Sequence, residues 1–187
     1  MENQETQGRM NFKFGLIWEG LNTNELEPFA TLYRREGTDI LYEETIYFNN
    51  KNSFNDTMVS SYSFSENEGF LGAIISLDKL PQRIKKIDIH ISFTWNVKKD
   101  INLGSLKNLR VVVQEAMNDK ELVQYSLVND KNILTEGSGL YLGELQKNQT
   151  INAEDVSLWV FKPDIRVVNS NYTVYDDLIR KTNLIFI

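Results

Sequence analysis

The sequence contains no cysteine, and this absence excludes disulfide bonds, thiolate zinc sites and cysteine nucleophiles. It contains one histidine, His90, so a histidine-rich metal centre is excluded as well. No stretch approaches the roughly 18 consecutive apolar residues that would span a membrane as a helix. The 20 basic residues form no dense block and are outnumbered by 26 acidic residues, which disfavours a nucleic-acid-binding function. What remains is an ordinary globular composition.

The first eleven residues, MENQETQGRMN, lack the positive end and the apolar core of a signal peptide. We therefore expect residues 1–9 to form a loose tail and residues 10–187 to form a single domain. The absence of cysteine suits a reducing compartment. We expect a cytoplasmic location, or one at the periphery of a membrane.

Apolar and polar residues alternate along much of the chain, which is typical of half-buried β-strands. The clearest case is Ile87–Trp95, where isoleucine and aromatic residues point one way and Asp88, His90 and Ser92 the other. We expect His90 to lie on a polar strand face, with a catalytic base as the remote alternative. The tryptophans fall in the apolar half of such patterns and are predicted to be core residues. The other predicted strands are Met10–Glu19, Pro28–Tyr33, Ile40–Tyr42, Thr45–Asn49, Met58–Phe64, Gly72–Leu77, Leu109–Met117, Glu121–Val128, Gly139–Glu144 and Ser157–Lys162.

The segments between these strands are predicted from their turn and charge patterns. Pro28 is expected to open its strand, and 34–39 to form a hairpin loop. The basic run 83–86 is interpreted as a solvated loop. Thr173–Lys181 has an N-terminal threonine cap, early acids and late bases, and is predicted to form one short helix. Many short strands followed by a terminal helix predict an all-β fold, an antiparallel β-sandwich.

Several blocks, in this order, resemble the TerD family of tellurium-resistance and bacterial stress proteins. They are GLIWEG (15–20), ELEPFATLY (25–33), YFNNKNSFNDT (47–57), ISLDKLPQRIKKIDIHISF (75–93), LGSLKNLRVVVQEAMNDKELVQYSL (103–127), TEGSGLYLGEL (135–145) and WVF (159–161). No block is a strong motif alone, and the resemblance, over residues 12–187, rests on their collinear order. It implies a two-sheet β-sandwich with a closing C-terminal helix.

The resemblance also implies a calcium site, because TerD-type domains bind calcium through acidic loops at one end of the sandwich. The family pattern contains Asp-x-Asp, paired asparagines, Gly-Asp-Asn and a Gly-Asp-Asp-Glu run. Matching positions of this chain carry glutamates in place of the Asp-x-Asp pair, the two asparagines, a polar turn and a Ser-Glu-Asn sequence. The candidate metal ligands are therefore Glu25, Glu27, Asn49, Asn50, Asn55, Asp56 and Glu66.

The last acidic run of that pattern is replaced here by Gly69-Phe70-Leu71, which offers no side-chain oxygen. Calcium requires six to eight oxygen ligands, several of them carboxylates. We therefore favour a degenerate calcium site and expect no cofactor, with a working Ca²⁺ site as the alternative. Without a metal, Glu25 and Glu27 would mark a solvated strand start, and Asn49 and Asn50 would be turn residues.

Three functions follow from these observations. The favoured one is a non-enzymatic TerD-like module that binds other proteins or assembles a stress-response complex near a membrane, with its exposed edge strands as docking sites. The second is a working calcium-dependent sensor. The third is a hydrolase that uses Glu25 and Glu27, whose Cα atoms would lie about 6–7 Å apart on one strand face. Tellurite chemistry itself has no support in the sequence, because there is no thiol and only four methionines.

Overall fold

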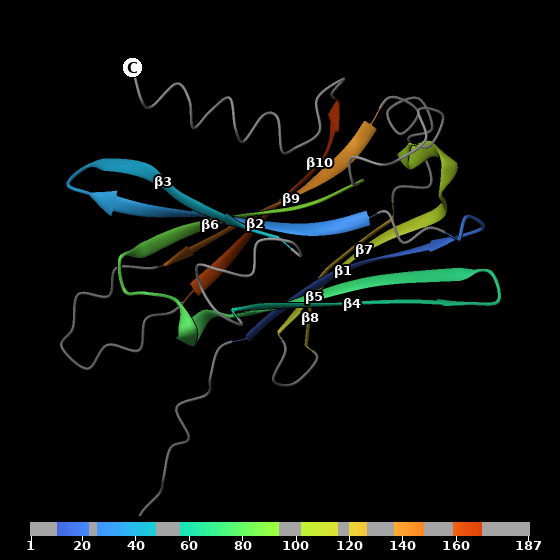
Figure 1. Ribbon diagram of the computed structural model, residues 1–187, viewed down its shortest axis with the longest axis horizontal. Coiled ribbons are helices and arrows are strands. Elements are labelled where there is room, and N and C mark those ends of the chain that lie inside the picture. Colours follow the sequence, from blue (N-terminus) through green and yellow to red (C-terminus); the bar gives the residue numbers. More distant parts are fainter. Residues whose placement is uncertain are drawn as a thin grey trace, which may run out of the picture.

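The computed structural model describes residues 11–22, 26–47, 57–93, 102–115, 120–126, 137–147 and 159–169. Its strands form two five-stranded sheets in which all paired neighbours are antiparallel, stacked as the layers of a sandwich (Figure 1). Sheet A contains, in spatial order, β4 (Met58–Ser65), β5 (Glu68–Ser76), β1 (Asn11–Glu19), β7 (Lys107–Glu115) and β8 (Lys120–Ser126). Sheet B contains, in spatial order, β10 (Trp159–Asn169), β9 (Gly137–Lys147), β6 (Ile84–Phe93), β2 (Leu26–Glu36) and β3 (Asp39–Ile46). The predicted all-β sandwich of two antiparallel sheets is confirmed.

The helical content of the described residues is two single 3₁₀ turns, η1 (Leu77–Lys79) and η2 (Leu103–Ser105). The helix predicted over Thr173–Lys181 lies outside the described residues. None of the helices in the described ranges is long and apolar enough to cross a membrane.

The core lies between the sheets and follows the period-2 pattern of the central strands. Trp18 and Leu16 of β1 and the isoleucines of β6 are fully buried. Trp18 is fixed further by its indole Nε1, which donates a hydrogen bond to the carbonyl oxygen of Leu21 at 2.8 Å. Trp159 is half-buried against this core, while Trp95 lies outside the described residues.

Several predicted strand ends are wrong because pairing carries strands past turn-forming residues. β2 begins at Leu26 rather than at Pro28, and Pro28 is accepted inside the strand because pairing with β3 starts only at Ala30. β3 is one strand where two short ones were predicted. Its pairing with β2 shifts register between Leu32 and Tyr33, and the strand continues through the shift. The hairpin that joins β2 to β3 is confirmed, with a shorter turn.

The interpretation of residues 83–86 as a solvated loop is wrong beyond Arg83. Ile84 begins β6 and is fully buried, and Lys86 lies within the strand. The hydrophobic isoleucine anchors this end of β6 in the core, which brings the lysine onto the outer face of sheet B.

Candidate functional site

Two of the seven candidate calcium ligands, Glu27 and Glu66, fall among the described residues. Glu25, Asn49, Asn50, Asn55 and Asp56 lie outside them, so both the calcium set and the Glu25/Glu27 hydrolase pair stay predictions. In Figure 1 the start of β2 and the β4–β5 hairpin lie at the same end of the sandwich. They belong to different sheets, however.

Glu27 faces outward from sheet B, since its neighbour Leu26 belongs to the core. Its strand partner on β6 is Ser92, and burial raises the pKa of its carboxyl above the ordinary value. Desolvation disfavours the charged form of a carboxyl, which is the form that binds a metal ion.

Glu66 lies in the two-residue turn between β4 and β5. Its φ of 53° is in the left-handed region, which is uncommon for a residue with a long side chain. The turn is held against the end of β1 by a hydrogen bond of 2.9 Å from the Gly20 amide to the Asn67 carbonyl oxygen. The backbone at this position is therefore fixed in a strained conformation.

The segment Gly69-Phe70-Leu71, which takes the place of the acidic run implied by the family resemblance, is packed on both faces of β5. Gly69 lies under Trp18, and a Cβ atom there would overlap the indole ring. Phe70 lies on the outer face of sheet A, where a Cβ on Gly72 would come 2.5 Å from its Cζ atom. Leu71 is 3% exposed in the core. All three residues serve packing.

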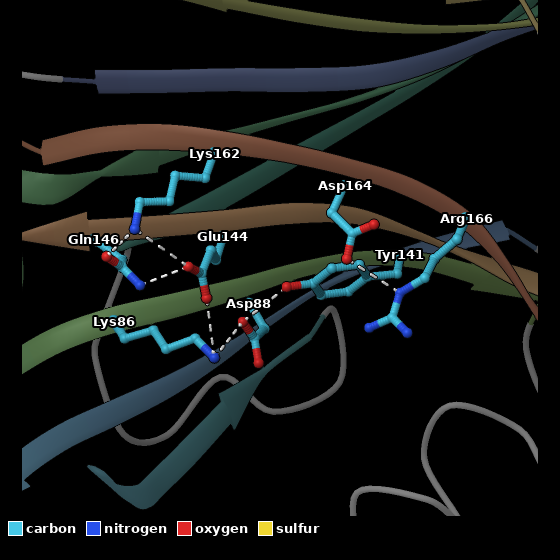
Figure 2. A network of polar contacts seen from close by, with 8 residues as sticks. All are labelled: Lys86, Asp88, Tyr141, Glu144, Gln146, Lys162, Asp164 and Arg166. Carbon is cyan, nitrogen blue, oxygen red and sulfur yellow. Dashed lines mark hydrogen bonds and ion pairs between the residues drawn. The ribbon is translucent and has the colours of Figure 1, made fainter. Parts of the chain in front are cut away.

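A network of charged groups, which the sequence interpretation did not single out, covers the outer face of sheet B (Figure 2). Lys86 on β6 holds its amine 3.1 Å from Asp88 Oδ1 and 3.1 Å from Glu144 Oε2 on β9. The Tyr141 hydroxyl donates a 3.1 Å hydrogen bond to Asp88 Oδ1. One lysine thus links carboxylates on two neighbouring strands.

The network continues towards the edge of the sheet on β10. Glu144 Oε1 accepts a hydrogen bond of 2.5 Å from Gln146 and lies 3.9 Å from the Lys162 amine, which itself donates to Gln146 at 2.6 Å. The Arg166 guanidinium lies 4.6 Å from the centre of the Tyr141 ring. Side-chain exposure rises from 13% at Asp88 to 57% at Lys162, so the β6 end is the better shielded one.

Burial and charge change the acidity of the groups around Asp88. Burial raises the pKa values of Tyr33 and Tyr141 well above those of ordinary tyrosines, and the negative charge of Asp88 raises them further. For Lys86, burial alone would lower the pKa, but the attraction of Asp88 and Glu144 outweighs it and the pKa is raised. Both tyrosines therefore remain hydrogen-bond donors, and the lysine remains a cation, across the neutral range.

With the ion pair of 3.3 Å between Arg166 and Asp164, this network contains three basic and three acidic side chains. It is also internally hydrogen-bonded, which suits a clamp between strands better than a ligand site. Among the residues that the structure describes, no group of three or more histidine or acidic residues is placed to hold a metal ion. The polar face of β6 was predicted correctly, and the structure adds that it is shielded: counted over the whole residue, Asp88 is 9% and Ser92 1% exposed. The signal available in the sequence was the recurrence of Lys86, Asp88 and His90 at alternate positions of one segment.

The two stacked antiparallel sheets define a β-sandwich protein. A model of the TerD domain matches residues 3–152, and the chain belongs to this family. No curated protein matches it.

Two solved structures have the same fold. One is a homologue of the telluride resistance protein TerD from Streptomyces coelicolor A3(2), with 18% identity and a TM-score of 0.62 over 87% of this chain and 92% of that one. The other is SAV2460, a protein of unknown function, with 12% identity and a TM-score of 0.63 over the same shares of the two chains. At these identities the likeness extends to the fold alone.

Proposed function

We propose that this TerD-family protein is a non-catalytic binding or assembly module whose calcium loops are degenerate. The observation that carries the proposal is the packing of Gly69, Phe70 and Leu71. Residues that pack an indole ring, cover a glycine and fill the core cannot be exchanged for carboxylates without loss of packing. The site would then lack several of the oxygens that calcium requires.

The polar network on sheet B supports the same proposal from a second direction. Asp88 and Glu144 both have a lysine partner, Lys86, so recruiting either carboxylate to a metal or to acid–base catalysis would break an ion pair. Breaking one partner of a shielded pair costs about 3 kcal/mol or more. If this network is structural, partners would bind at the edges of the sandwich and not on the outer face of sheet B.

One structural relative is titled a homologue of a telluride resistance protein. We extend to this chain a role in a bacterial stress response, in contact with other proteins of a cytoplasmic or membrane-peripheral complex. The chain has no thiol, so such a role would not include direct thiol chemistry on tellurium compounds.

Thermal unfolding of the whole chain with calcium, with magnesium and with a chelator tests the degenerate loops. A ligand that binds only the folded state raises its stability by about 2.7 kcal/mol at a hundredfold excess over the dissociation constant. We expect the midpoint in millimolar calcium to equal that in chelator. A calcium-specific rise that Glu27→Gln reduces would overturn the proposal in favour of the sensor. A second experiment identifies the partner: the tagged protein is purified from its native organism, and the proteins that are retained with it are identified.

A further inference from the structure

Among the described strands, four form the edges of the two sheets, and β4 differs from the other three. β3 contains Asp39, Glu43 and Glu44, and β8 contains Lys120 and Glu121. β10 contains Pro163 among charged residues, with a register shift after it. Charges, proline and irregular pairing are the devices by which edge strands avoid adding a further strand. β4, with the sequence MVSSYSFS, has no charged residue and no proline.

The pairing of β4 with β5 is also regular along its whole length, from Met58 opposite Ile75 to Ser65 opposite Glu68. Backbone N–H and C=O groups of a strand point alternately to its two sides, so about half of those of β4 face away from β5. None of the described strands pairs with that side. Eight residues at about 3.3 Å each give an open edge of roughly 26 Å.

The side chains beside this edge are apolar and exposed. Val59 on β4 is 60% exposed, and its cross-strand partner Ile74 on β5 is 37% exposed. Both lie on the outer face of sheet A, while Tyr62 faces the opposite side, with its ring 6.0 Å from that of Trp18. The edge therefore offers backbone groups for pairing together with apolar surface that pairing would bury.

We propose that β4 is an assembly surface at which a second copy of this chain adds its own β4, antiparallel, to extend sheet A across two molecules. The proposal deepens the assembly role proposed above by naming the surface and the partner. A copy of the same strand fits because pairing about a two-fold axis places each side chain opposite one from the same short sequence. Like charges placed opposite each other destabilise a sheet, and β4 has no charge to oppose.

The geometry of such a pair is restricted. Directly opposed residues of antiparallel strands point to the same face, so a two-fold axis that continues the sheet must lie midway between one residue and the same residue of the other copy. Because β4 has eight residues, the most extensive pairing of this kind covers seven of them, either 58–64 centred on Ser61 or 59–65 centred on Tyr62. A single pair of strands buries little surface compared with a stable dimer interface, so we expect a dissociation constant in the micromolar range.

Sedimentation of the full chain over a range of micromolar concentrations tests the dimer. We expect the mass to rise from 21.7 kDa towards twice that value. Val59→Lys, which places a cation on the edge and removes the exposed valine, should weaken the dimer by about tenfold or more. The matched control is Val160→Lys on β10, a 39% exposed valine on another edge, which should leave the mass unchanged.

Because the chain has no cysteine, single-cysteine variants locate the axis. Oxidation should cross-link either Ser61→Cys or Tyr62→Cys efficiently, and Val160→Cys poorly.

A wild-type protein that stays monomeric throughout, a dimer that survives Val59→Lys, or a dimer lost only with Val160→Lys would each overturn the proposal. These results are independent of the calcium melts, so a monomer without a calcium response would leave the module proposal standing and remove only the β4 dimer. Unchanged melting midpoints of the variants would show that folding is not the cause.

Discussion

The outer faces of the two sheets reverse what strand alternation predicts. On sheet B, the polar residues Thr31, Asp88 and Ser92 are at most 9% exposed. On sheet A, by contrast, the apolar residues Val59 and Ile74 are 60% and 37% exposed. Alternation divides residues between the two faces of a strand, but it does not decide which outer face meets water. Sheet B tolerates buried polar residues because its lysine, tyrosine and carboxylate groups form ion pairs and hydrogen bonds with one another.

The strongest way to break this contrast is to remove Asp88. Asp88→Ala would leave the Lys86 amine with one carboxylate fewer and the Tyr141 hydroxyl without its acceptor. We expect a loss of about 3 kcal/mol in the free energy of unfolding. Urea denaturation measures it, with Ser63→Ala on the exposed face of sheet A as control, which should stay within about 0.5 kcal/mol. Equal effects of the two substitutions would show that the network adds nothing to stability.

A glycine on sheet A provides the next largest effect. Gly69→Ala would push a methyl group into the Trp18 indole, and Trp18 is fully buried with its nitrogen bonded to Leu21. Overpacking of this kind costs about 1–3 kcal/mol. The expected result is a lower denaturation midpoint with perturbed tryptophan fluorescence. Gly37→Ala, where a Cβ has open space around it, controls for the loss of a glycine, although its φ of 60° adds a small cost of its own. A Gly69→Ala protein as stable as the wild type would show that Trp18 can move aside.

The tyrosines of sheet B predict the response to alkaline pH. An unfolded chain ionises tyrosine near pH 10, whereas burial and Asp88 raise the pKa of Tyr141 in the folded state. Stability from the neutral phenol is therefore fully present below about pH 10 and lost as the pH rises further. Tyr141→Phe should cost about 1 kcal/mol at pH 7 and make the decline above pH 10 shallower. Denaturation at a series of pH values measures both quantities, and an unchanged slope would contradict the proposed coupling.

The smallest effect concerns the strained turn of sheet A. Glu66→Gly should relieve the left-handed backbone and stabilise the protein by up to about 1 kcal/mol. Glu68→Gly, a change at the first residue of β5, is the matched comparison and should destabilise slightly, because glycine weakens a strand. Thermal melts of the two variants should thus move in opposite directions. A loss of stability in Glu66→Gly would mean that the side chain makes a contact that outweighs the strain.

Prediction from the sequence succeeded where one strand carries the signal by itself. The pattern of Ile87, Ile89 and Ile91 placed β6 and its buried face correctly, and Trp18 was rightly assigned to the core. Strand ends were less accurate, as at Pro28 and Ile84, because a strand extends as far as its neighbour offers hydrogen bonds. Of the candidate metal ligands, the structure describes Glu27 and Glu66, which belong to different sheets. The other candidate ligands stay predictions.

By itself, then, the sequence determined the all-β class, the inward faces of the strands and the absence of thiol chemistry, since these follow from local alternation and composition. Only the tertiary structure decided that Lys86 and Asp88 of β6 meet Tyr141 and Glu144 of β9, although Asp88 and Tyr141 are 53 residues apart in the chain. It also decided that uncharged β4 is an edge strand whose outer side pairs with no other described strand. The reason is that strand order is fixed by pairing between distant segments, and no local pattern records which strand will be a neighbour and which will be an edge.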